Sequence, residues 1–154
     1  LGGGVYPVSA FLASRAVMQV FEPGSHGSTF GGNALAAAIG LEALCVIEEE
    51  RLVERSAEQG VYLKARLEAM TAGLARSVRG LGLWVGVDID PALASAKALV
   101  SSLADAGVLT KETHETVIRF APPLTIDRAE LDWGLARCEA VFAAVAAKAR
   151  QRAA

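Results

Sequence analysis

Hydrophobic residues near the end of the chain recur every three or four positions. They are Leu131, Leu135, Cys138, Phe142 and Val145. This is the period of an amphipathic helix. Asp127 and Glu130 stand just before it, three residues apart, which is the spacing of an N-terminal capping box. The pattern therefore predicts a final helix that begins after Asp127.

The pattern changes to strict alternation between residues 81 and 89. Leucine, valine and isoleucine at the odd positions alternate with Gly82, Trp84, Gly86 and Asp88. Alternation of this kind is typical of a β-strand with one buried face. We therefore expect one strand here, starting near Val78.

Three further elements are expected between that strand and the final helix. The pair Asp90-Pro91 provides the cap and first-turn proline of a helix, and Gly107 provides its end. Short apolar segments at 108–110 and 117–120 predict two strands. Residues 76–154 are thus expected to form a compact α+β unit of order β-α-β-β-α.

The first half of the chain has the helical period instead. No proline occurs from Ala34 to about Leu74, and leucines recur at helical spacing. Asn33 can cap the start, because its side chain can accept from first-turn amides. We expect two long helices or one kinked helix, with Gly40 and Gly60 as weak points. Before Asn33 the chain is glycine-rich and irregular, with a short helical stretch over Ser9–Val20.

Composition places the chain among folded proteins. Of its 154 residues, 53% are hydrophobic and 21% are charged, which excludes a disordered or fibrous chain. The longest uncharged run, residues 1–14, is interrupted by glycines and Pro7, so we expect no membrane segment. A net charge of −2 lacks the basic surface that binds nucleic acid, so we expect no nucleic-acid partner.

The two cysteines, Cys45 and Cys138, each lie within an apolar helical pattern. The sequence has no CxxC motif and no cluster of histidine and cysteine, so we expect no metal site. We interpret both residues as buried free thiols in a reducing compartment. A cytoplasmic location is the corresponding expectation.

The segment from His26 to Asn33 is the densest candidate for a binding site. It combines the hydroxyls of Ser28 and Thr29 with glycine amides and the start of a helix. These are the groups that bind an anion such as phosphate. An ordinary glycine-serine turn that caps the helix explains the same residues, and physical chemistry alone favours that explanation.

Arg119 is the second candidate, because it stands in an otherwise apolar strand. A guanidinium buried there needs a carboxylate or phosphate partner, since burying an unpaired cation is costly. A structural ion pair, or an edge-strand arginine that faces water, explains Arg119 equally well. Neither histidine is placed for a catalytic triad. None of the four lysines lies in an apolar pattern that would lower its pKa for covalent catalysis.

Three motifs give the chain a resemblance to a known family. They are LGGGVYPVSA at 1–10, HGSTFGGN at 26–33 and IRFAPPL at 118–124. Their order and spacing resemble those of the class III pyridoxal-phosphate aminotransferases, over essentially the whole chain. Within that class, YPVS at 6–9, Thr113-His114 and Pro122-Pro123 are more similar to the ornithine than to the acetylornithine aminotransferases.

The resemblance implies an α/β fold that is part of a fold-type I transferase. Residues 1–75 then correspond to the C-terminal end of the large cofactor-binding domain plus the long connecting helix. Residues 76–154 correspond to a complete small C-terminal domain. The implied cofactor is pyridoxal 5'-phosphate. The implied reaction moves the δ-amino group of ornithine to a 2-oxo acid, which yields glutamate 5-semialdehyde and an amino acid.

The resemblance also implies roles for three residues. Thr29, with Ser28 beside it, binds the cofactor phosphate across the interface of a homodimer. Arg119 recognises a substrate carboxylate and can pair with a glutamate of the large domain. The phosphate interpretation of the glycine-rich loop thereby gains over the ordinary turn.

The same resemblance places the Schiff-base lysine two residues before Leu1, so no catalytic residue is expected within this chain. We expect the chain alone to be inactive, because it resembles the C-terminal part of such an enzyme, as a split or truncated gene product or as a fragment. A split enzyme would need a companion N-terminal chain that carries the lysine. Two alternatives remain. The chain is a non-catalytic remnant or interaction fragment, or it belongs to a related class III transaminase that acts on acetylornithine, 4-aminobutyrate or lysine.

Overall fold

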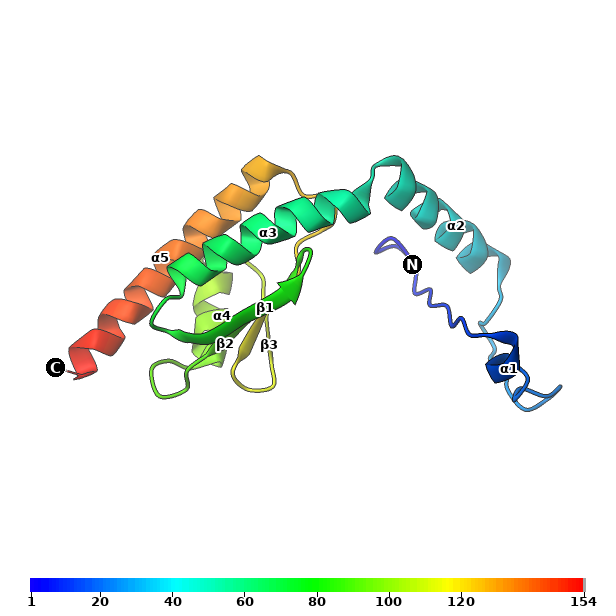
Figure 1. Ribbon diagram of the computed structural model, residues 1–154, viewed down its shortest axis with the longest axis horizontal. Coiled ribbons are helices and arrows are strands. Elements are labelled where there is room, and N and C mark those ends of the chain that lie inside the picture. Colours follow the sequence, from blue (N-terminus) through cyan, green and yellow to red (C-terminus); the bar gives the residue numbers. More distant parts are fainter. Residues whose placement is uncertain (154) are drawn as a thin grey trace. The chain divides into compact units, whose positions relative to one another are not determined.

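The computed structural model in Figure 1 describes residues 1–153. Ala154, the last residue of the predicted small domain, lies outside the described residues. The chain forms two compact units, Leu1–Leu52 and Val53–Ala154. The predicted assignment of residues 1–75 and 76–154 to a large and a small domain stays a prediction.

The first unit contains two helices, α1 (Arg15–Met18) and α2 (Ala34–Glu49). No hydrophobic side chain of residues 1–51 is buried. The helix expected over Ser9–Val20 is therefore limited to the single turn of α1, because a short helix without a packing partner is marginal in water. Phe11 and Leu12, which precede α1, are exposed.

The start of α2 is as predicted, because the Asn33 side chain accepts a hydrogen bond of 2.8 Å from the Ala36 amide. The next helix, α3, spans Leu52–Met70. The segment from Ala34 to Met70 thus forms two helices, and the break between them falls at Arg51, whose φ is 51°. Neither Gly40 nor Gly60 is the weak point that the sequence suggested.

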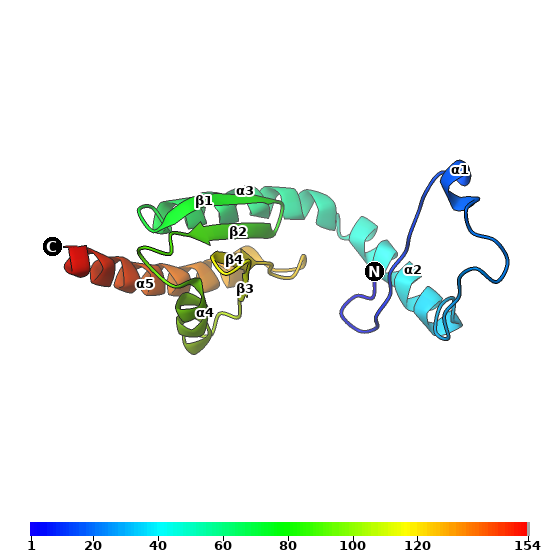
Figure 2. The same cartoon turned by 90° about the horizontal axis from the view of Figure 1, so that it is seen from below.

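The second unit contains a four-stranded antiparallel sheet with strand order β1-β2-β4-β3. The strands are β1 (Ala75–Leu81), β2 (Trp84–Ile89), β3 (Lys111–Thr113) and β4 (Val117–Phe120). Two further helices, α4 (Ala96–Asp105) and α5 (Arg128–Ala153), complete this unit. Figure 2 shows the same elements from below.

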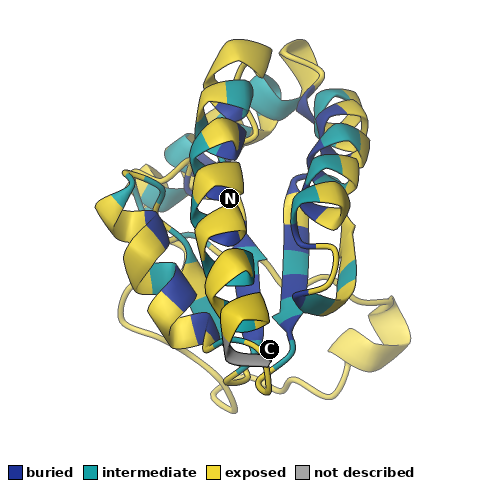
Figure 3. Ribbon diagram, turned by 90° about the vertical axis from the view of Figure 1, so that its left-hand side faces the viewer, coloured by how far each residue is buried: buried dark blue, intermediate teal, exposed yellow. Residues whose placement is uncertain are grey.

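The core of the second unit lies between the helices and one face of the sheet. Val85, Val87 and Ile89 of β2 are fully buried against leucines of α3 and α4 and against Phe142 of α5. Figure 3 shows that buried and intermediate positions alternate with exposed ones along the helices. The helices therefore cover the face of the sheet that carries Val85. We call the opposite face, with Trp84, Gly86 and Asp88, the open face.

The single strand expected through residues 81–89 is wrong, because the chain turns back at Gly82 and Leu83. Leu81 of β1 pairs with Trp84 of β2, and the φ of Gly82 is 55°, a conformation that suits glycine. Residues paired across the turn share a face, so Leu81 lies on the open face with Trp84 and is 91% exposed. Apolar residues keep alternating with others through the turn in the sequence, although the odd positions change from the open face to the covered face there. The unit is thus β-β-α-β-β-α rather than β-α-β-β-α.

Two other boundaries differ from the prediction, and two agree. The helix expected from Asp90-Pro91 begins at Ala96 instead, because Ser95 is its cap and accepts from Ala98 N at 3.3 Å. The strand expected at 108–110 lies at Lys111–Thr113. The end of α4 before Gly107 is confirmed. The capping box of α5 is also confirmed, since Glu130 N donates to Asp127 Oδ1 at 2.7 Å and Asp127 N to Glu130 Oε2 at 3.3 Å.

The hairpin of β1 and β2 lies against α3, as Figures 1 and 2 both show. A Cβ atom at Gly60 would come within 2.3 Å of the carbonyl carbon and oxygen of Gly82. Ser56, one turn earlier on α3, accepts a hydrogen bond of 3.1 Å from Leu83 N. At Gly60 the helix and the hairpin turn are therefore too close for any larger residue.

Candidate functional site

Arg119 lies on β4 and faces the open side of the sheet. Its direct neighbours across the sheet are Gly86 on β2 and Lys111 on β3. Residues directly opposite each other in an antiparallel pair point to the same face. Arg119 and Lys111 therefore share the open face. On the other side of Arg119, β2 presents Gly86, which has no side chain.

The guanidinium of Arg119 has an aromatic neighbour and no carboxylate. Its Cζ lies 5.8 Å from the centre of the Trp84 ring. Within the part of the chain that the structure describes, Arg119 makes no ion pair and no side-chain hydrogen bond. The structural ion pair that the sequence left open is thus absent from the described residues. Arg119 is available to a carboxylate from elsewhere.

Asp88, also on the open face, is held by two arginines of β1. Its Oδ1 lies 2.7 Å from Arg76 Nη2 and its Oδ2 lies 3.8 Å from Arg79 Nη1. Arg76 also donates to Thr116 Oγ1 at 3.2 Å. The hydrogen bond from Arg76 holds the pKa of the Asp88 carboxyl below its usual value. The carboxylate of Asp88 is therefore already paired with cations of β1.

The loop that follows Arg119 is fixed by α3. Arg55 Nη2 donates to the carbonyl oxygens of Thr125 and Ile126 at 2.8 and 2.7 Å. These residues lie between β4 and α5. Because guanidinium groups bind two oxygens at once in a fixed geometry, this contact ties the end of the Arg119 strand to the long helix.

The second candidate site, the loop before α2, is exposed. Ser28 Oγ accepts from the Gly31 amide at 2.8 Å, and Asn33 Nδ2 donates to the Phe30 carbonyl at 2.7 Å. The Thr29 hydroxyl and the Thr29 amide make no hydrogen bond with any described residue. The loop is therefore a turn closed by its own hydrogen bonds, in which the hydroxyl and amide of Thr29 stay available as donors.

A cavity of about 590 Å³ lies beside this turn. Its walls come from residues 6–9 and from 30–33 and the first turn of α2. Ser28 and Thr29 are adjacent in the turn, whereas Arg119 belongs to the other unit. Neither Ser28 nor Thr29 lines the cavity, and the relation between the loop and Arg119 stays a prediction.

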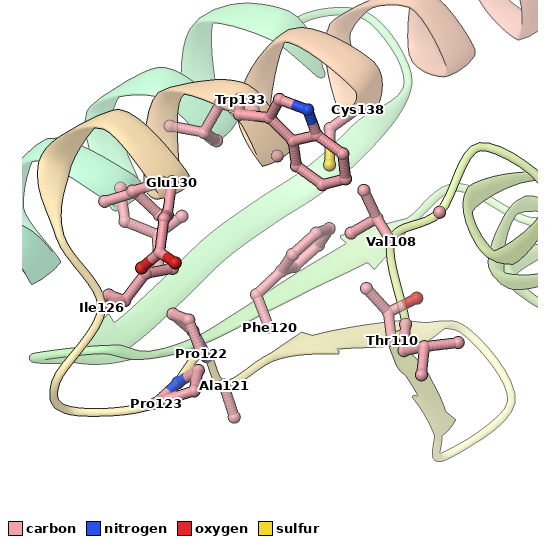
Figure 4. Close-up of a pocket in the computed structure, with 16 residues that line it drawn as sticks. Val108, Thr110, Phe120, Ala121, Pro122, Pro123, Ile126, Glu130, Trp133 and Cys138 are labelled. Carbon is pink, nitrogen blue, oxygen red and sulfur yellow. The ribbon is translucent and has the colours of Figure 1, made fainter.

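A second cavity, shown in Figure 4, was not predicted from the sequence. It has a volume of about 320 Å³ and lies between the segment after α4, the Pro122-Pro123 loop and the start of α5. Cys138 lines it, and burial raises the pKa of this thiol to about 11. A thiol with such a pKa is protonated at neutral pH and is a poor nucleophile.

Other kinds of site find no support in residues 1–153. No three histidine, cysteine, aspartate or glutamate side chains gather there as a metal site would require. None of the helices in that range combines the length and the apolar character needed to span a bilayer. Trp84 and Asp88 were not predicted as site residues. The sequence feature that could have indicated them is that both lie an even number of positions from Gly86 in the alternating pattern, and so on the same face of the strand.

Comparison with known proteins identifies the family. The model of the family "Aminotransferase class-III" matches residues 1–142. The ornithine aminotransferase of Halalkalibacterium halodurans is 53% identical over 135 residues, which are 88% of this chain and 33% of that protein. The chain spans about a third of the length of the curated relatives that it matches.

Solved structures agree with this result. The ornithine δ-aminotransferase of Plasmodium falciparum matches with a TM-score of 0.88 and 34% identity, over 96% of this chain and 39% of that one. The acetylornithine aminotransferase of Elizabethkingia anophelis matches with a TM-score of 0.83 and 40% identity, over 93% of this chain and 37% of that one. The predicted α/β fold, as part of a fold-type I transferase, is confirmed, and so is the predicted resemblance. The chain belongs to the class III aminotransferase family.

Proposed function

We propose that this chain supplies the cofactor-phosphate loop and a substrate-binding strand of an aminotransferase. The reaction we propose transfers the δ-amino group of ornithine to a 2-oxo acid. The identity of 53% to an ornithine aminotransferase supports the choice of ornithine. The observation that carries the proposal is Arg119, an arginine without an ionic partner among the described residues, on the open face of a rigid sheet.

Arg119 is the group we propose for the substrate carboxylate. A guanidinium can donate two parallel hydrogen bonds to one carboxylate, which gives both affinity and a defined orientation. Lys111, opposite Arg119 on β3, adds positive charge to the same face. The chain's role toward the 2-oxo acid is therefore to bind its carboxylate and to set its orientation.

Ser28 and Thr29 are the groups we propose for the phosphate of pyridoxal 5'-phosphate. The donors suit that group, because the Thr29 hydroxyl and amide have no partner among the described residues and Ser28 accepts one bond while its hydroxyl proton stays available. When bound, pyridoxal phosphate supplies the electron sink that amino-group transfer needs. The site completed by this loop is that of a partner subunit in the proposed homodimer.

The chain alone is inactive in this proposal, and the Schiff-base lysine belongs to the N-terminal part of the enzyme, which these 154 residues do not include. The four lysines of this chain support this view, because Lys97, Lys111 and Lys148 are exposed and Lys64 pairs with Glu68 at 3.5 Å. A lysine that acts as a nucleophile needs desolvation or a cationic neighbour to lower its pKa. A cytoplasmic location stays a prediction.

Complementation tests the proposal. The chain is co-expressed with the part of the H. halodurans relative that it does not match, and ornithine is assayed with 2-oxoglutarate. We expect activity from the pair and none from either part alone. The control is the same relative divided at the corresponding point, which shows whether two pieces can assemble.

The substrate panel decides between related activities. Acetylornithine is included because an acetylornithine aminotransferase is among the similar structures, together with 4-aminobutyrate and lysine. Preference for acetylornithine would replace the ornithine assignment. An inactive pair beside an active control would contradict the proposed function and favour a non-catalytic remnant.

A further inference from the structure

Three residues of β2 face the open side of the sheet around Arg119. Gly86 lies directly opposite Arg119, with Trp84 two residues before it and Asp88 two residues after. The diagonal neighbours of a residue in an antiparallel pair lie within reach of a long side chain. Arg119 can therefore extend toward Trp84 or toward Asp88, and Gly86 presents no side chain that would block either direction.

The carboxylate of Asp88 is already engaged on its other side. Arg76 and Arg79 of β1 bind one oxygen each, at 2.7 and 3.8 Å, and Arg119 is not within ion-pair distance of it. An anion that two cations already neutralise attracts a third cation less strongly. The ion-pair cluster thus removes the nearest competitor for the guanidinium of Arg119.

Arg119 is turned toward Trp84 instead. The Cζ of Arg119 lies 5.8 Å from the centre of the indole ring, which is within the range of a cation–π contact. Trp84 is 64% exposed, so its position on the surface is not explained by burial in the core. A ring beside the guanidinium restricts the arginine while its N–H groups stay free.

We propose that Trp84 is a positioning residue for Arg119. The indole holds the guanidinium away from Asp88 and over the open face, where its N–H groups meet an incoming carboxylate. The carboxylate half of this inference rests on the proposed function. The orientation half rests on the geometry of the sheet alone, and the two halves are measured separately.

The orientation is tested by NMR on the full chain labelled with ¹⁵N-arginine. The Arg119→Lys variant assigns the Nε–Hε resonance of Arg119 by its disappearance. We expect the Trp84→Leu variant to move that resonance, because the ring current of the indole is lost. Trp133→Leu is the matched control, since the Cζ of Arg137 lies 3.5 Å from the centre of the Trp133 ring. This variant should move the Arg137 resonance and leave that of Arg119 in place. An Arg119 resonance unchanged in Trp84→Leu would overturn the proposal.

The effect on recognition is tested by titrating the same samples with glutarate, a dicarboxylate without a reactive group. We expect glutarate to shift the Arg119 resonance, and its affinity to fall about two- to fivefold in Trp84→Leu, the size of one exposed cation–π contact. Trp84→Phe keeps a ring and should retain most of the affinity. Circular dichroism confirms that each variant folds.

The outcomes separate the two claims. Equal glutarate affinity in the original chain and in Trp84→Leu would overturn the positioning role and leave carboxylate binding intact. Absence of any glutarate response at Arg119 in the original chain would instead contradict the proposed function and, with it, the carboxylate half of this inference. A loss of affinity in Trp84→Leu that Trp84→Phe restores would support both.

Discussion

Replacement of Gly60 by alanine should destabilise the second unit by pushing α3 away from the β1–β2 hairpin. The added Cβ would lie 2.3 Å from the carbonyl carbon and oxygen of Gly82, where ordinary contacts begin at 3.4 Å. Both partners are backbone, so roughly 1 Å of separation is needed, and such overpacking costs up to about 3 kcal/mol. Alanine returns about 1 kcal/mol in helix propensity. The net loss is about 2 kcal/mol.

Urea unfolding followed by tryptophan fluorescence measures this loss, because both tryptophans, Trp84 and Trp133, belong to the second unit. With a typical slope, 2 kcal/mol lowers the midpoint by about 1 M urea. Gly134→Ala is the matched control, since Gly134 is also helical and a Cβ there meets no atom within 4 Å. That control should gain up to about 1 kcal/mol. A Gly60→Ala variant as stable as Gly134→Ala would refute the close approach.

Three further predictions concern single residues. The hydrogen bond from Arg76 lowers the pKa of Asp88 in the folded state. The stability that this interaction contributes is present above the unfolded-state pKa and is lost as the pH falls through the folded-state pKa. The urea midpoint should therefore drop less between neutral pH and about pH 3 in Asp88→Asn than in the original chain. Cys45 should react with iodoacetamide well before Cys138, whose thiol is buried with a pKa of about 11, and peptide mass analysis that finds equal labelling would contradict the packing. Asn33→Ala should cost α2 about 0.5–2 kcal/mol, seen as faster hydrogen exchange in its first turn, whereas Asn33→Ser should not.

Local signals in the sequence were sufficient where one short segment determines the structure. The capping box of Asp127 and Glu130 and the Asn33 cap are examples, because each cap needs partners only three residues away. The turn at Gly82 escaped detection because apolar residues keep alternating through it in the sequence, although Leu81 is exposed and faces the side of the sheet opposite to Val85. The contact between Gly60 and Gly82 joins distant segments, so no local pattern indicates it.

The candidate sites follow the same division. The strand of Arg119 was predicted from its apolar neighbours, and three motifs identified the family. Trp84 was not recognised as a neighbour of Arg119, because that contact depends on the register between β2 and β4. The turn that holds Ser28 and Thr29 does not by itself identify a ligand. The phosphate interpretation of these two residues came from the resemblance to the family.

The most direct test of the account is the dependence of the complemented enzyme on Arg119. Kinetics are measured on the co-expressed pair with 2-oxoglutarate as the varied substrate, for the original chain and for Arg119→Lys. A lost bidentate, charge-assisted contact should raise the KM for 2-oxoglutarate about ten- to a hundredfold. An active pair in which Arg119→Lys leaves that KM unchanged would contradict the assignment of Arg119 to the substrate carboxylate.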